Sequence, residues 1–409
     1  MNNKLWTKNF TIITLGTAIS LFGSAISSFA TGLLILDYTG SVFLFAIYMI
    51  LYELPRIFVP TLVGPILDKF SRRRAIYLLD FCSSVIYAVY GFVLMKGEPG
   101  FVPLVIGIAL LGTIGSAYNV AYESFYPLLV TEGNMGKAYS ISSTMQSLIM
   151  VVTPLSIFLY HQIGIAPLFF INALTYLLAA IFETQIQVEE KYVMKKQEKF
   201  GIRQYRDTFK EGIEYLKQNR GLLFIVAYFT FSSFSGGGHM VAGLPYFRDT
   251  YGVRGEYIFI FVEGCHIVGR VLAGAFHYRH KIKPEYKFTI AFCVYLYIAF
   301  VGGTYLYMPI IVMMIMNLTM GLASMTSYNI RISATQSYVP DENKGRFNGT
   351  FQMMSTAGMM MGEFISGYMA DIMDKRFVIS IFCLIEFLAA WAFMFRGRKE
   401  VSRIYNRET

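Results

Sequence analysis

Charged side chains occur at helical spacing inside apolar stretches of this sequence. Glu53 and Arg56 lie three residues apart in LYELPRIF, and Glu263, His266 and Arg270 occupy positions i, i+3 and i+7 of FVEGCHIVGRVLAG. Residues at these spacings share one face of an α-helix. A carboxylate in a poorly solvated cavity favours its neutral form, and a nearby arginine opposes this. A change in solvent access would then bind and release a proton.

Three interpretations of these groups stay open at this point. They form a structural ion-pair network, a proton-coupling site, or a contact surface for a charged substrate, and Glu363 adds another carboxylate of the same kind. Arginine stays charged, whereas histidine titrates near neutral pH. We therefore favour Glu263 as the proton-exchanging group and Glu53 as a paired, structural one.

The elements that must position these groups are long apolar segments. The chain has 409 residues, of which 55% are hydrophobic and 15% charged, against about 25% charged in an ordinary soluble domain. A helix needs about 20 apolar residues to cross a bilayer. Twelve such segments are predicted, at 10–36, 41–67, 75–95, 101–129, 139–161, 164–186, 220–246, 254–277, 286–306, 308–337, 347–370 and 376–395. We predict an all-α integral membrane protein.

The charge distribution predicts orientation rather than nucleic-acid binding. The formal net charge is +9, and most Lys and Arg residues fall in the N-terminal tail, alternate loops, the central linker and the C-terminal tail. This asymmetry follows the positive-inside rule and predicts cytoplasmic termini. The four cysteines all lie within predicted spans without CxxC spacing, so neither a disulfide framework nor a metal site is expected.

A polar segment divides six predicted spans from six. An amphipathic helix is expected in YRDTFKEGIEYLKQNRGL. Shifted by 209 or 210 residues, short motifs of the first half fall on similar motifs of the second, for example VTEGNMGK on VPDENKGR. We predict two pseudo-symmetric six-helix bundles at residues 1–187 and 220–397, a cytoplasmic linker at 188–219 and a basic cytoplasmic tail at 398–409.

The loop GPILDKFSRRR after the second predicted span resembles the signature of the major facilitator superfamily. Ser71 stands where that signature has glycine. Its physical expectation is a gating latch, in which Asp68 closes a helix and accepts hydrogen bonds from a neighbouring helix N-terminus or pairs with an arginine. The alternative is that the arginines only set topology and bind anionic headgroups. Asp80 and Glu123 are the expected partners of the arginines. The residues assigned to the latch are Gly64, Asp68, Lys69, Arg72, Arg73, Asp80 and Glu123.

Further segments, among them LPYFRDTYG and YVPDENKGRFNG, resemble the macrolide-efflux and siderophore-exporter branch of the superfamily. Two positions depart from related transporters. Gly112 stands near a site that is often basic, and the proline-glycine antiporter motif is reduced to Thr153-Pro154.

The resemblance implies the major facilitator fold and a secondary active transporter. We expect a monomer in the plasma (inner) membrane that exports a small amphiphilic compound, such as a drug or siderophore, by proton antiport with alternating access. An importer or uniporter of the same fold, and a receptor or scaffold without transport, are the alternatives. No ATP-binding motif, nucleophile or metal set accompanies the charges, so neither an enzyme nor a cofactor is expected. The expected partners are substrate, protons and membrane lipids, without nucleic acid.

Overall fold

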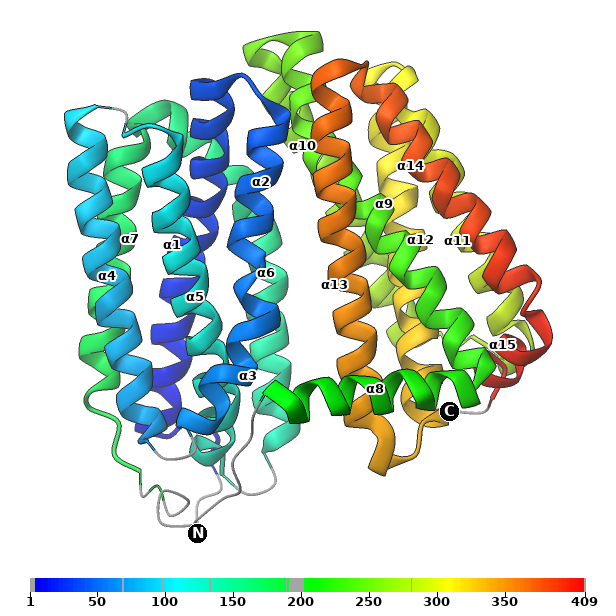
Figure 1. Cartoon of the computed structure of the whole chain (residues 1–409), viewed down its shortest axis with the longest axis horizontal. Helices are drawn as coiled ribbons and strands as arrows, with labels where there is room; N and C mark the ends of the chain where they lie inside the picture. The colour runs from blue at the N-terminus through cyan, green and yellow to red at the C-terminus, as the bar shows by residue number, and fades with distance from the viewer. Residues whose placement is uncertain are drawn as a thin grey trace. The chain divides into compact units, whose positions relative to one another are not determined.

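The computed structural model describes residues 4–67, 70–97, 99–131, 134–188, 190, 202–280 and 282–407. Helices and turns make up this described part, without a strand, which confirms the predicted all-α class (Figure 1). The chain forms two compact units. One comprises Met1–Gly40 with Tyr48–Tyr205, and the other Ser41–Ile47 with Arg206–Thr409.

The first unit is built from long apolar helices. The side chain of Thr7 accepts a hydrogen bond from the Phe10 backbone N–H at the start of the first helix, and Gly40 ends that helix with a left-handed φ of 64°. Both are ordinary helix-terminating residues. The helices are α1 (Lys8–Thr39), α2 (Val42–Glu53), α3 (Pro55–Leu67), α4 (Arg72–Lys96), α5 (Phe101–Phe125), the short η1 (Tyr126–Leu129), α6 (Met135–Ile163) and α7 (Ile165–Glu183).

The second unit continues the same pattern. Its elements are α8 (Ile202–Gln218), α9 (Arg220–Tyr251), α10 (Val253–Arg279), η3 (Pro284–Tyr286), α11 (Lys287–Thr304), η4 (Tyr305–Tyr307), α12 (Ile310–Tyr338), α13 (Asp341–Ile372), α14 (Lys375–Ala389), the π-helical η5 (Ala390–Phe395) and α15 (Arg398–Tyr405). The segment expected to form an amphipathic linker helix falls on α8.

The start of α2 belongs to the second unit, because Asp371 near the end of α13 caps it. Its carboxylate accepts hydrogen bonds from the Ser41 hydroxyl (2.6 Å) and the backbone N–H groups of Val42 (2.7 Å) and Phe43 (3.2 Å). A negative charge at a helix N-terminus satisfies free N–H groups and complements the helix dipole. The other end of α2 stops at Glu53, and α3 begins at Pro55, as a helix-interrupting proline requires.

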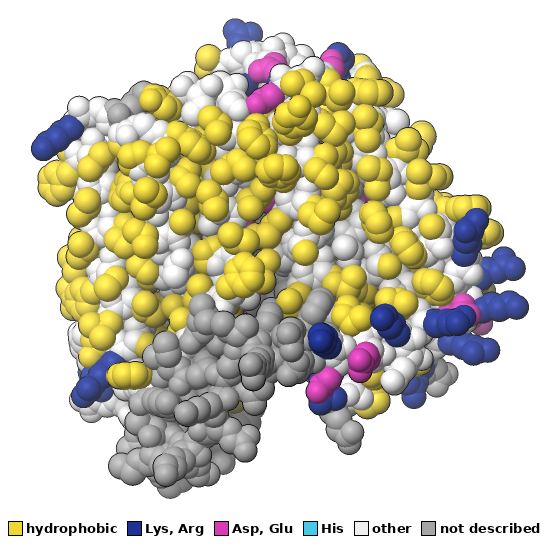
Figure 2. Space-filling view, viewed as in Figure 1, with side chains coloured by type: hydrophobic (Ala, Val, Ile, Leu, Met, Phe, Trp, Pro, Cys, Tyr) yellow, Lys and Arg dark blue, Asp and Glu magenta, His cyan; other side chains and the backbone are white. Residues whose placement is uncertain are grey.

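Ten helices of the described residues are long and apolar enough to cross a membrane: α1, α2 with the start of α3, α4, α5 with η1, α7, α9, α10, α11 with its flanking turns, α12, and α14 with η5. The two remaining predicted spans fall on α6 and α13, which have 29 and 32 residues. Figure 2 shows hydrophobic side chains along the helices and Lys and Arg side chains gathered at helix ends. On α4, for instance, Val85, Val89 and Phe92 form an exposed apolar stripe, as expected for a lipid-facing surface.

Glycines let two helix pairs of the second unit pack backbone to backbone. A Cβ added at Gly237 on α9 would lie 2.2 Å from the Met359 carbonyl oxygen on α13, and one at Gly362 on α13 would lie 2.0 Å from the Phe234 carbonyl oxygen on α9. α10 and α12 approach each other in the same way at Gly269. Small residues at such interfaces are typical of helices packed in membranes.

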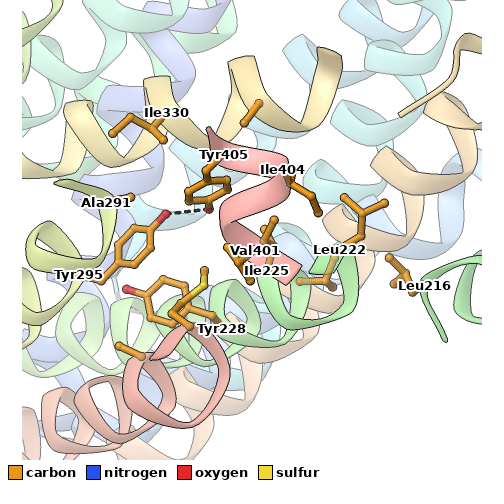
Figure 3. Close-up of a cluster of buried hydrophobic side chains, with 14 of the residues drawn as sticks. Leu216, Leu222, Ile225, Tyr228, Ala291, Tyr295, Ile330, Val401, Ile404 and Tyr405 are labelled. Carbon is orange, nitrogen blue, oxygen red and sulfur yellow. Dashed lines mark hydrogen bonds between the residues drawn. The ribbon is translucent and has the colours of Figure 1, made fainter. Parts of the chain in front are cut away.

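The last helix, α15, folds back onto the second unit (Figure 3). Val401, Ile404 and Tyr405 are buried against residues of α9, α11 and α12, and the Tyr405 hydroxyl shares a 2.8 Å hydrogen bond with that of Tyr295. Residues 398–405, which were assigned to a basic tail, therefore form a docked amphipathic helix. The apolar side chains at i, i+3 and i+4 supply the face that docks.

Candidate functional site

Glu263 lies beside His239 of a neighbouring helix, and His239 in turn contacts Tyr305. His239 of α9 places its Nε2 atom 3.8 Å from Glu263 Oε1, which is ion-pair range but longer than a hydrogen bond. The same Nε2 atom lies 3.1 Å from the Tyr305 hydroxyl oxygen, and the two rings are stacked with centroids 5.5 Å apart. The side chains of Glu263 and His239 are 30% and 24% exposed, so water or a small ligand can reach them.

His239 can hold two different hydrogen-bonding states in this position. An unprotonated Nε2 accepts a hydrogen bond from the Tyr305 hydroxyl, whereas a protonated Nε2 carries a donor and, on a doubly protonated ring, a positive charge beside Glu263. A proton on His239 therefore changes the charge next to Glu263. No ion pair joins Glu263 to an arginine or lysine among the described residues.

His266 and Arg270 follow Glu263 along α10, as the spacing predicted. The His266 Nε2 atom lies 3.3 Å from the Ser324 hydroxyl oxygen on α12. Gly321 of α12 packs against the backbone of His266 and Arg270, so α12 fixes the position of this turn of α10. Glu363 is 1% exposed and lies on α13, where its backbone nitrogen would be 3.2 Å from a Cβ added at Gly237. We name Glu263, His266, His239 and Tyr305 the α10 cluster.

In the first unit Glu53 and Arg56 pair with each other. The Arg56 Nη1 atom donates a 2.8 Å hydrogen bond to Glu53 Oε2, and the side chains are 21% (Glu53) and 53% (Arg56) exposed. The pair bridges the break between α2 and α3. Two residues with the same i, i+3 spacing as Glu263 and His266 thus form an ion pair across the break between α2 and α3.

The latch residues are only partly within the described structure. Asp68 and Lys69 lie outside the described residues, and Gly64 lies in α3. Glu190 accepts hydrogen bonds from the Ser71 hydroxyl (2.7 Å) and the backbone N–H groups of Arg72 (2.8 Å) and Arg73 (3.2 Å), so it caps α4.

The guanidinium groups of this loop contact backbone carbonyls of the first unit. Arg72 Nη1 donates to the Ser124 carbonyl (3.0 Å), and Arg73 Nη2 donates to the Thr184 carbonyl (2.9 Å). The role of these arginines in a latch stays a prediction.

Asp80 and Glu123, the expected partners of the arginines, lie in different surroundings. Asp80 is 1% exposed and lies next to Glu183 at the end of α7. Glu123 is exposed and lines a pocket of about 410 Å³ with Thr17, Leu21, Asn119, Tyr122, Tyr126, Ser142 and Met145.

Sequence reasoning did not name three polar side chains that lie in or near buried polar clusters: Glu183 in the first unit, and Glu386 and Tyr305 in the second. Glu386 is 5% exposed and accepts a 2.7 Å hydrogen bond from the Ser232 hydroxyl. Both glutamates stand alone inside predicted apolar spans, which is the signal that would have found them. Tyr305 carries no such signal, because aromatic residues are frequent at span ends.

The sequence is similar to a known family and to several known transporters. The family model described as Major Facilitator Superfamily matches residues 13–363. An uncharacterized MFS-type transporter, YkuC of Bacillus subtilis, is 22% identical over 309 residues, covering 72% of this chain and 70% of that protein. Macrolide efflux protein A of Streptococcus pyogenes is 26% identical over 221 residues, or 53% of each protein.

A solved structure gives the same result for the fold. The inward-facing, occupied crystal structure of a bacterial homolog to the human lysosomal transporter Spinster superposes with a TM-score of 0.68 at 12% identity, covering 98% of both chains. At this identity the likeness shows the fold alone. Because the family model covers most of the sequence, the chain belongs to the major facilitator superfamily.

Proposed function

We propose that this transporter exports a small amphiphilic compound in exchange for protons, by alternating access. The observation that carries the proposal is the α10 cluster, in which Glu263 on the apolar helix α10 faces His239 on the preceding helix α9. Histidine is the side chain whose ordinary titration falls near neutral pH. A histidine and a carboxylate side by side can therefore exchange a proton as a pair near neutral pH when their access to water changes.

Glu263 is the exchanging group in this proposal. His239 contacts it directly, while His266 and Arg270 on the same helix adjust its affinity for the proton. Glu53 is the structural counterpart in this proposal, because it forms a 2.8 Å ion pair with Arg56.

The direction of transport rests on two supports. The resemblance of the loops to exporters agrees with the similarity to macrolide efflux protein A over about half of each chain. The absence of an ATP-binding motif from the sequence is consistent with an ion gradient as the energy source. A proton gradient directed into the cell would then drive substrate outward.

The test is transport by the full chain in proteoliposomes with an imposed pH gradient. The substrate panel contains a macrolide, a siderophore, a peptide and a lipid, and proton movement is followed with an internal pH dye. Antiport moves protons opposite to substrate. Movement of both in the same direction identifies an importer instead, and substrate movement that ignores the pH gradient identifies a uniporter.

Glu263→Gln assigns the coupling group. It should abolish pH-driven transport and leave substrate exchange down its own gradient, because only the proton step is removed. Glu285→Gln is the matched control, since Glu285 is an exposed carboxylate of the same unit and should leave coupling intact. Coupled transport by the Glu263→Gln protein would overturn the assignment.

A further inference from the structure

A second carboxyl site lies inside the first unit, at the contact between α4 and α7. We propose that Asp80 and Glu183 together bind one exchangeable proton, which reaches them from the pocket lined by Glu123 through the hydroxyl groups of Thr17 and Tyr118. The proposal concerns proton binding itself and stands whether or not Glu263 is the coupling group.

The geometry of the two carboxyl groups requires a proton. Asp80 is 1% exposed and Glu183 is 0% exposed, and their side chains lie next to each other. An ionised carboxylate is an acceptor only, so a hydrogen bond between two carboxyl groups exists only when one of them is protonated. The Asp80 Oδ2 and Glu183 Oε2 atoms are both buried, and no N–H or hydroxyl donor of the described chain contacts either atom.

No cation replaces that proton. Among the described residues, no arginine, lysine or histidine lies within ion-pair distance of Asp80 or Glu183. Arg73 is close along the chain, but its Nη2 atom donates to the Thr184 carbonyl. Two buried negative charges side by side without a counter-charge would be costly, so the pair holds a proton.

The other groups that face the pair can donate hydrogen bonds but carry no charge as phenols. They are Tyr118 and Tyr122 of α5 and Tyr176 of α7. From α1, Gly16 approaches Glu183 and brings no titratable group: a Cβ built there would lie 3.5 Å from Glu183 Oε1.

A chain of hydroxyl groups links the pair to the pocket. The Tyr118 hydroxyl donates a 3.2 Å hydrogen bond to Glu183 Oε1, and the Thr17 hydroxyl lies 2.9 Å from the Tyr118 hydroxyl. Thr17 also lines the pocket of about 410 Å³. Hydroxyl groups both donate and accept. The Thr17 hydroxyl can therefore take a proton from pocket water while it gives its own proton to Tyr118. Tyr118 in turn gives its own proton to Glu183, and both hydroxyls end neutral.

A permanently protonated, purely structural pair would share the static geometry, so the test must measure exchange. The full chain is purified in detergent, and infrared difference spectra between acidic and alkaline pH, and after transfer to D₂O, report the C=O band of protonated carboxyl groups. The wild type should show a band that is lost as pH rises and that shifts in D₂O.

Two substitutions at the pair identify the band. Glu183→Gln and Asp80→Asn should each remove it, while Glu386→Gln, at a buried carboxyl of the second unit held by hydroxyl groups, should leave it. The Glu183→Gln protein should fold, because the glutamine amide can donate to Asp80 in place of the shared proton. A wild-type spectrum without the band, or a band unchanged in both pair variants, would overturn the proposal.

Tyr118→Phe tests the route. It leaves both carboxyl groups in place, so the band should persist, but its exchange in D₂O should slow by about tenfold or more because the relay is broken. Tyr90→Phe is the control, since its hydroxyl bonds the Pro103 carbonyl away from the pair. A band that never exchanges in the wild type would show a structural proton. Equal exchange in both tyrosine variants would exclude the Thr17–Tyr118 route.

Discussion

Replacing Gly321 with alanine should lower the stability of the second unit and disturb the α10 cluster. The added Cβ would lie 2.0 Å from the His266 carbonyl oxygen on α10, where real Cβ atoms stay beyond 3.0 Å. The obstacle is backbone, which no side-chain rotation can move. α10 and α12 must therefore separate, and because Gly269 makes the reciprocal 2.0 Å approach to the Leu318 carbonyl, the whole contact opens.

Two opposing terms set the magnitude. Alanine in a helix interior is favoured over glycine by about 0.8–1 kcal/mol. Forcing extra volume into a closed contact costs about 1–3 kcal/mol, and here the separation also weakens packing along two long helices. The difference between these two terms gives an expected net loss of up to about 2 kcal/mol for Gly321→Ala. Gly264→Ala is the control, because Gly264 lies on α10 with no atom within 4 Å of its added Cβ.

Thermal unfolding in detergent, followed by circular dichroism, measures both variants under one condition. Gly321→Ala should unfold at a lower temperature than the wild type, and Gly264→Ala at the same or a higher temperature, because only the propensity term acts there. Equal stability of the two variants would refute the close contact between α10 and α12. A loss confined to Gly321→Ala should be accompanied by reduced pH-driven transport, since His266 is carried on the displaced backbone.

Three other outcomes are expected. In a cysteine-free background, cysteines near Lys96 and at Asp374 should react with an impermeant thiol reagent from outside, and one at Ser71 should not; labelling of Ser71 from outside would reverse the orientation. The hydrogen bond from Arg376 lowers the pKa of Asp374, so this group stabilises the fold above its unfolded pKa of about 3.9 and the contribution is lost as pH falls through the lower folded value. The stability difference between wild type and Asp374→Asn should shrink below about pH 4, and a pH-independent difference would contradict this. Glu53→Gln should reduce the amount of folded protein in the membrane, because its arginine partner loses its counter-charge; unchanged levels would show that the pair is dispensable.

The sequence predicted the helices well because each is encoded locally. Apolar length alone marks the spans, and Pro55 marks the break between α2 and α3, since proline lacks the N–H that the helix needs. α15 was missed although Val401, Ile404 and Tyr405 have helical spacing. Charged residues dominate that segment, and what stabilises it is its docking on α9, α11 and α12, a tertiary effect that a local pattern does not report.

The pairing of charged side chains was predicted only where the partner lies close along the chain. The i, i+3 spacing of Glu53 and Arg56 led directly to their ion pair. The same spacing on α10 did not pair Glu263 with His266, because His239 of α9 reaches Glu263 instead. Which helices face each other, and with what rotation, depends on packing such as the glycine contact between α10 and α12. Spacing along one helix carries no such information.

Buried charge in the described residues is strongly one-sided, and Asp80 lies next to another acid, Glu183. The almost fully buried ionisable acids and bases there are Asp80, Glu183, Glu256, Lys287, Glu363 and Glu386, that is, five acids and one base. Glu256 has its counter-charge in Arg248, 2.9 Å away. Among the described residues, no basic side chain lies within ion-pair distance of Asp80 or Glu183. Sequence reasoning looks for the opposite charge, and the basic loop at Arg72 and Arg73 was the nearest source. Under the proposed function this incomplete charge balance has a use, because a bound proton supplies the missing positive charge.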